Sequence, residues 1–117
     1  MDAHTGPRLV LQLGYHTVQL RQADAMTGER LTIGTGDTNM LVAEGLHTSR
    51  HHAWIEVHRN AYYLVDTSTN GTFVQTEDEQ VQFVHRNRVR LWGAGWISLG
   101  EPLHTRRPIS FSEELVA

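Results

Sequence analysis

Short apolar segments alternate with turn-forming residues along the whole chain. The segments are rich in Val, Ile, Leu, Tyr, Trp and Thr, and clusters of Gly, Asn, Asp or His-Arg-Asn separate them. Such runs, recurring roughly every eight to twelve residues, are typical of short β-strands joined by turns. The pattern predicts strands over residues 9–13, 16–22, 30–33, 39–42, 53–58, 61–66, 72–76, 81–84, 88–91, 96–99 and 103–105.

The clearest hairpin joins residues 53–58 to residues 61–66 through Arg59 and Asn60. Alternate side chains of both runs form one more apolar face, which is typical of an antiparallel sheet that covers a core on one side. Leu64 and Phe73 are expected to be core residues. The alternation predicts a β-sandwich or a barrel.

Helices are expected to be minor, because no segment longer than about ten residues shows a sustained helical stripe. A short helix or a tail is expected only at residues 112–115, which open with Ser-Glu-Glu. We therefore expect one domain over residues 9–104, an N-terminal extension over residues 1–8 and a C-terminal tail over residues 105–117.

Composition and charge narrow the possible functions. The 117 residues carry a net charge of −3 with His neutral and contain no Cys. A basic field that would recruit nucleic acid is missing, as are disulfides and thiolate metal sites. No apolar run reaches the roughly 20 residues that span a bilayer, and the first residues lack the order of a signal peptide. We expect a cytoplasmic protein without nucleic-acid, membrane or cofactor binding.

Three loop segments combine turn-forming residues with side chains that bind oxyanions. Glycine permits close approach of a ligand, Ser49 offers a hydroxyl, and the Arg50 guanidinium can hold a phosphate through two hydrogen bonds. Asn70 has a carboxamide that can donate to and accept from an extended peptide backbone. The loops predict a site for a phosphorylated peptide, and they cover residues 34–39, 45–53 and 66–73.

The second and third loops resemble the signature motifs of the forkhead-associated (FHA) domain family. They read Ser-Arg-His-His-Ala over residues 49–53 and Asp-Thr-Ser-Thr-Asn-Gly-Thr-Phe-Val over residues 66–74, in the order and at the spacing of that family. The segments at residues 33–34, 39–42 and 99–100 resemble its flanking motifs. The resemblance covers residues 9–103.

This resemblance implies an all-β fold, an eleven-stranded antiparallel β-sandwich with a peptide site in the loops at one end. The family binds phosphothreonine peptides and acts in signalling proteins as a non-enzymatic interaction module. Carried over by position, Ser49 and Arg50 contact the phosphate, and Thr69 and Asn70 contact the peptide. Gly34 and Thr35 form the first loop of the site, and the structural positions are His52 and Gly71.

The first loop departs from the family pattern, since the family has Gly-Arg where this chain reads Gly34-Thr35. That Arg is a principal phosphate contact in the family. A charge-assisted hydrogen bond is worth roughly 1.5 to 3 kcal/mol, so its loss predicts about ten- to a hundredfold weaker binding. Arg50, backbone N–H groups near Gly34 and Gly36, or protonated His47 and His51 are candidates to compensate. The alternative is an FHA domain that makes phosphate-independent or self-association contacts.

The residues themselves also suggest two other functions. The eight His residues suggest a metal-binding β-protein, for which His47 and His51 would have to meet through a folded loop. A hydrolase would need Ser49 or Ser68 as nucleophile with His52 and Asp66, but the sequence contains no Gly-x-Ser-x-Gly elbow.

The last strand-rich region also carries a basic row. Arg86, Arg88 and Arg90 alternate along one segment and are expected to line an exposed strand face. This face is either solvated or directed at an anionic partner.

Overall fold

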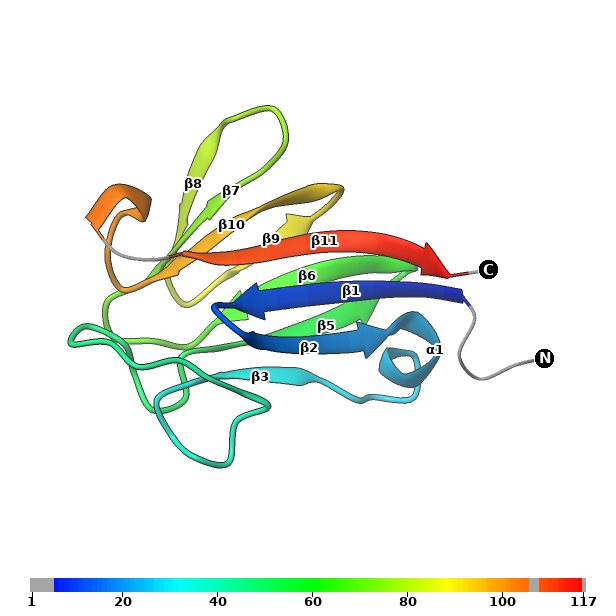
Figure 1. Ribbon diagram of the computed structural model, residues 1–117, viewed down its shortest axis with the longest axis horizontal. Helices are drawn as coiled ribbons and strands as arrows, with labels where there is room; N and C mark the ends of the chain where they lie inside the picture. Colours follow the sequence, from blue (N-terminus) through cyan, green and yellow to red (C-terminus); the bar gives the residue numbers. More distant parts are fainter. Residues whose placement is uncertain (1–5, 106–107, 117) are drawn as a thin grey trace.

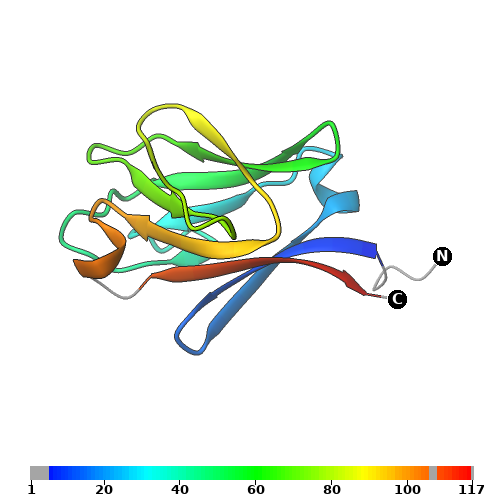
Figure 2. The same ribbon diagram turned by 90° about the horizontal axis from the view of Figure 1, so that it is seen from above.

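The computed structural model describes residues 6–105 and 108–116 and consists of two packed β-sheets (Figures 1 and 2). The six-stranded sheet contains, in spatial order, β2 (His16–Arg21), β1 (Gly6–Leu13), β11 (Ile109–Val116), β10 (Ala94–Leu99), β7 (Thr72–Gln75) and β8 (Val81–Val84). The five-stranded sheet contains β4 (Leu41–Val42), β3 (Leu31–Gly34), β5 (Ala53–His58), β6 (Ala61–Asp66) and β9 (Arg88–Leu91).

The predicted all-β sandwich is confirmed, with eleven strands in the described residues. In that part of the chain the strand pairs are antiparallel with one exception, since β3 and β4 run parallel over two residue pairs. The core lies between the sheets and is formed by inward-facing side chains of both. Its fully buried members include Leu9, Leu11, Leu20, Leu31, Ile33, Leu41, Ile55, Leu64, Leu91, Ile97, Leu99 and Phe111.

The β5–β6 hairpin forms as the alternation predicts. Arg59 and Asn60 both have positive φ angles, 51° and 64°, which is the geometry of a type I′ turn. Ala53, Ile55 and Leu64 are buried on the inner face. Because the two strands pair in register from Ala53–Asp66 to His58–Ala61, the loops that precede β5 and follow β6 lie at the same end of the sheet.

The prediction of a C-terminal tail is wrong for residues 109–116. These residues form β11, which pairs with β1 on one side and β10 on the other. The Ser-Glu-Glu sequence does not start a helix, because Ile109 and Phe111 alternate at strand spacing and fill the core, where they are 2% exposed. Residues 106, 107 and 117 lie outside the described part.

The first strand also begins earlier than predicted. β1 starts at Gly6, and residues 6–8 of the expected N-terminal extension pair with β11, while residues 1–5 lie outside the described part. Two short helices were not predicted: α1 (Gln22–Ala25) and a 3₁₀ helix (Leu103–Thr105), where a strand was expected. In the described residues, no helix is long and apolar enough to cross a bilayer.

Phe73 is not a core residue. Alternate side chains of a strand point to opposite faces, and Thr72 and Val74 are buried, so Phe73 lies on the outer face of β7. Its ring packs on the exposed ring of Phe83, at a centroid distance of 4.9 Å.

Candidate functional site

The three loops singled out from the sequence meet at one end of the sandwich. Residues 35–40 connect β3 to β4, residues 43–52 connect β4 to β5, and residues 67–71 connect β6 to β7. All three lie at the left end of the molecule in Figure 1, opposite α1 and the β5–β6 turn. The structure therefore brings together the predicted positions Gly34, Thr35, Ser49, Arg50, Thr69 and Asn70.

The first loop is attached to the second by backbone hydrogen bonds beyond the ends of β3 and β5. The Thr35 and Gly36 N–H groups donate to the carbonyls of Ser49 and Arg50, each at 3.1 Å. A Cβ atom on Gly34 would lie 2.1 Å from the Arg50 carbonyl oxygen, so this close approach requires glycine. Asn39 Nδ2 donates to the carbonyls of Gly36 and Arg50, both at 2.8 Å, and fixes the loop from within.

This attachment removes part of one suggested compensation for the missing Arg. The backbone N–H groups of Thr35 and Gly36 already have carbonyl partners, so they are not available to a phosphate. Thr35 offers only a neutral hydroxyl on a half-buried side chain. Any positive charge for an anion at this end must therefore come from side chains outside the first loop.

Ser49 and Arg50 lie in the second loop. Ser49 Oγ accepts the Thr69 N–H at 3.1 Å, which leaves the hydroxyl hydrogen for donation to another group. The Arg50 side chain is exposed, and its stem lies over Gly36, where a Cβ would come within 2.7 Å of Arg50 Cγ. Among the described residues its guanidinium has no hydrogen-bond or carboxylate partner, so it is positioned by packing and remains open to a ligand.

Thr69 and Asn70 come from the third loop and are both exposed. Asn70 Nδ2 donates to the His47 carbonyl at 3.2 Å, which ties the third loop to the second. The Asn70 amide oxygen can accept a hydrogen bond from an extended peptide.

His52 lies beneath these residues, fully buried, and links two loops. Its Nδ1 accepts the Ser49 N–H at 3.0 Å, so that nitrogen carries no proton. Nε2 is then the protonated nitrogen, and it lies 2.9 Å from the Gly71 carbonyl oxygen and 3.1 Å from Thr72 Oγ1. The ring thereby sets the backbone position of Ser49 relative to the third loop.

Asp66 anchors the start of the third loop. Its carboxylate is 1% exposed and accepts four hydrogen bonds, from the Ser68 and Arg86 backbone N–H groups and from the Ser68 and Thr72 hydroxyls. Burial acts to raise the pKa of Asp66, but these hydrogen bonds together lower it from its ordinary value of 3.8. The charged form is the one that holds the loop.

The serine, histidine and aspartate residues that a hydrolase would need do not form a catalytic triad here. His52 Nδ1 receives the backbone N–H of Ser49 rather than its hydroxyl. Ser68 is fully buried, and its hydroxyl donates to Asp66 and accepts the Gly71 N–H. These contacts use the serine, histidine and aspartate to fix loop backbone.

Gly71 satisfies a separate constraint in the third loop. Its φ angle is 85°, and a Cβ there would lie 2.4 Å from the Phe83 ring.

In the part of the chain that the structure covers, no three His, Asp or Glu side chains gather to hold a metal ion.

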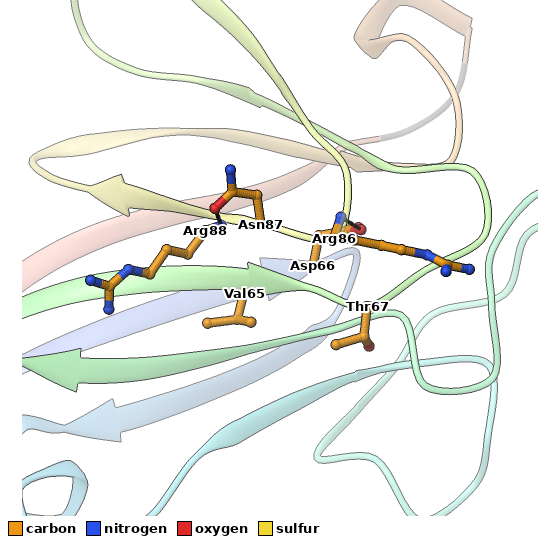
Figure 3. A pocket seen from close by; sticks show the side chains of 6 residues that line it. All are labelled: Val65, Asp66, Thr67, Arg86, Asn87 and Arg88. Atoms are coloured by element: carbon orange, nitrogen blue, oxygen red, sulfur yellow. Dashed lines mark hydrogen bonds between the residues drawn. The ribbon is translucent and has the colours of Figure 1, made fainter.

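A groove borders the third loop and was not predicted from the sequence. It is an open hollow of about 660 Å³ between the end of β6 and the start of β9 (Figure 3). The basic row of the sequence gave a partial signal for it, because two of its arginines line the groove. Its lining residues are Val65, Asp66, Thr67, Arg86, Asn87 and Arg88.

Comparison with known proteins agrees with this arrangement. The family model of the FHA domain matches residues 31–100, more than half of the chain. The chain belongs to the FHA domain family. The matched range contains all three loops and the groove, and it leaves out β1, β2 and β11 of the FHA sandwich.

Solved FHA structures share the fold. The FHA-1 domain of Rv1747 from Mycobacterium tuberculosis aligns with a TM-score of 0.72 at 16% identity, over 92% of this chain and 97% of that one. The MEK1 FHA domain, solved with a phosphothreonine peptide of HOP1, gives 0.64 at 16% identity, over 92% and 95%. Mycobacterium tuberculosis EmbR, solved with a low-affinity phosphopeptide, gives 0.61 at 23% identity, over 97% of this chain and 25% of EmbR. No curated protein matches the chain.

Proposed function

We propose that this FHA domain is a protein-interaction module that binds phosphothreonine peptides at its loop end. The observation that carries the proposal is the pair formed by Ser49 and Arg50, a half-buried hydroxyl and an exposed guanidinium on a backbone that His52 fixes. A hydroxyl donor beside a guanidinium suits a phosphate dianion. Thr69 and Asn70 would hold the peptide backbone beside it.

Complexes of other FHA domains with phosphopeptides support this proposal. The MEK1 domain was solved with a phosphothreonine peptide and EmbR with a phosphopeptide. Here the role would be recognition within signalling proteins, with no chemical step performed by the domain.

A second candidate function is phosphate-independent association. The observation that favours it is the first loop, in which Thr35 carries no charge and the Thr35 and Gly36 N–H groups are already bonded. If Arg50 alone supplies too little charge, the loop end contacts an unphosphorylated partner.

The experiment that separates the two functions is binding of an oriented phosphothreonine library, with unphosphorylated and phosphoserine libraries as controls. Arg50→Gln keeps most of the stem over Gly36 while it removes the charge, so we expect about ten- to a hundredfold weaker binding of a selected peptide. Thr35→Arg is expected to strengthen binding by a similar factor, because it restores the cation of the family motif.

Fluorescence anisotropy titrations with the selected peptide measure both changes. Arg90→Ala, which removes an exposed positive charge from β9, serves as the control. If neither the folded native domain nor Thr35→Arg binds phosphopeptides, phosphate-independent association is the remaining function.

A further inference from the structure

The groove between β6 and β9 starts at the loop that is proposed to hold the peptide. Asp66 and Thr67 line it, and the chain continues from them directly to Thr69 and Asn70. Val65 contributes an apolar floor from the outer face of β6 (Figure 3). A peptide that lies on Thr69 and Asn70 can therefore continue into this groove within a few residues, at roughly 3.3 Å per extended residue.

Arg86 lies at the loop end of the groove. It occupies the turn between β8 and β9 with a φ of 53°, and its N–H donates to Asp66 Oδ2 at 2.8 Å. Its Nε lies 3.4 Å from the Ser68 carbonyl oxygen, so the side chain extends beside the third loop, as Figure 3 shows. The guanidinium is thus held next to the backbone that carries Thr69.

Arg88 lies at the other end of the groove. It pairs with Val65 across the β6–β9 ladder, and its guanidinium carbon is 4.9 Å from the centre of the Tyr63 ring. In Figure 3 its side chain points away from that of Arg86. Stacking on an aromatic ring orients a guanidinium while its N–H groups remain able to bind an anion.

The charge of the groove is positive. Both guanidinium groups are always charged in proteins. Asp66 is the one carboxylate among the lining residues, and it is buried with four donors on its oxygens. Its negative charge is turned inward to those donors, whereas the arginine side chains are exposed.

We propose that this groove binds an anionic flank of the phosphopeptide, either acidic residues or a second phosphorylated residue near the phosphothreonine. This inference rests on the proposed function and adds a specificity to it. A domain that lacks the family Arg in its first loop would gain part of its affinity from Arg86 and Arg88 instead. Their side chains point in opposite directions in Figure 3, so the two arginines contact the flank at different positions along the groove.

The test is a set of titrations with matched phosphothreonine peptides. Flanking positions on either side carry three Ala, three Glu or one phosphoserine among Ala, and each peptide has an unphosphorylated-threonine partner. The proteins are the native domain, Arg86→Ala, Arg88→Ala and the control Arg90→Ala, which removes the same charge from β9 outside the groove. Titrations at low and physiological salt measure the electrostatic part.

We expect the native domain to prefer an anionic flank over Ala by about fivefold, the size of an exposed ion-pair contribution. Arg86→Ala and Arg88→Ala should each weaken this preference and leave the Ala-flanked peptide nearly unchanged, while Arg90→Ala should retain it. A preference for phosphoserine but not Glu identifies a second phosphate as the occupant.

Two results would overturn the groove assignment. One is a flank preference that is undiminished in both groove variants, and the other is an equal loss in Arg90→Ala, which would indicate general attraction. Both leave the proposed function standing if Arg50→Gln still weakens the Ala-flanked peptide. Failure of the native domain and Thr35→Arg to bind any phosphopeptide would remove the proposed function, and the groove assignment with it.

Discussion

The buried side chains beneath the loop end fix the positions of the loop residues that are proposed to bind a ligand. His52 and Asp66 are both buried, and each binds backbone groups of loops that are distant in sequence. Ser49 and Asn70 add direct contacts between the second and third loops. Binding residues on these loops are therefore pre-organised by a polar network, which is stable only if each member keeps its partners.

Asp66 makes this network sensitive to acid. Its folded-state pKa lies below the ordinary value of 3.8, so the carboxylate stabilises the fold above pH 3.8, and this contribution is lost as the pH falls from there through the folded-state pKa. Asp66→Asn should lower the free energy of unfolding at pH 7 by about 2–4 kcal/mol, because its NH₂ group would face N–H donors. The deficit should shrink as the pH falls below about 4 and through the lowered pKa of Asp66.

Urea unfolding at a series of pH values measures this effect. Asp37→Asn, which removes an exposed carboxylate from the first loop, is the charge-matched control and should differ little from the native protein. A deficit of constant size at every pH would show that the charge of Asp66 is not what stabilises the loop.

At the scale of elements, the site is a set of strand ends. Beyond the ends of β3 and β5, the Thr35 and Gly36 N–H groups bond the first loop to the second, and β6 runs directly into the third loop. The β5–β6 hairpin fixes the register of both strands and thus the relative height of the loops. A slip of one residue in that hairpin would turn the buried His52 outward.

The hairpin turn offers a way to strengthen this element. Arg59 adopts a φ of 51°, a left-handed conformation that favours glycine. Arg59→Gly should raise the free energy of unfolding by about 0.5 to 1 kcal/mol, since it relieves that strain. Arg59→Ala removes the same side chain and keeps the strain, so it should give no gain. Urea unfolding compares the two variants, and equal stability of both would contradict this explanation.

At the scale of the whole molecule, the strands at the two ends of the described chain pair with each other inside the six-stranded sheet. β11 lies between β1 and β10, so the last strand joins the first hairpin to the rest of the fold. The Phe111 ring sits close to Gly95, where a Cβ would approach it to 2.7 Å. The segment expected as a tail is thus a central strand of the sandwich.

Phe111 should therefore behave as a core residue. Phe111→Ala is expected to lower the free energy of unfolding by about 3–5 kcal/mol, through lost burial and the cavity that remains. Ser112→Ala, on the opposite face of β11, should change it by less than about 0.5 kcal/mol. Thermal or urea unfolding measures both variants. A near-native Phe111→Ala would mean that β11 contributes little to the fold.

The sequence by itself determined the all-β class, most strand positions and the residues gathered at the loop end. Strand alternation and turn residues are local signals, and the motifs around Ser49 and Asn70 are contiguous. It did not determine β11, because Ser-Glu-Glu at residues 112–114 is also compatible with the start of a helix. The burial of Ile109 and Phe111 in the core is what selects the strand. Only the tertiary structure showed that the Thr35 and Gly36 N–H groups are occupied and that Arg86 reaches Ser68. Hydrogen-bond partners and grooves of this kind join residues far apart in the chain, and their positions depend on how the strands pack.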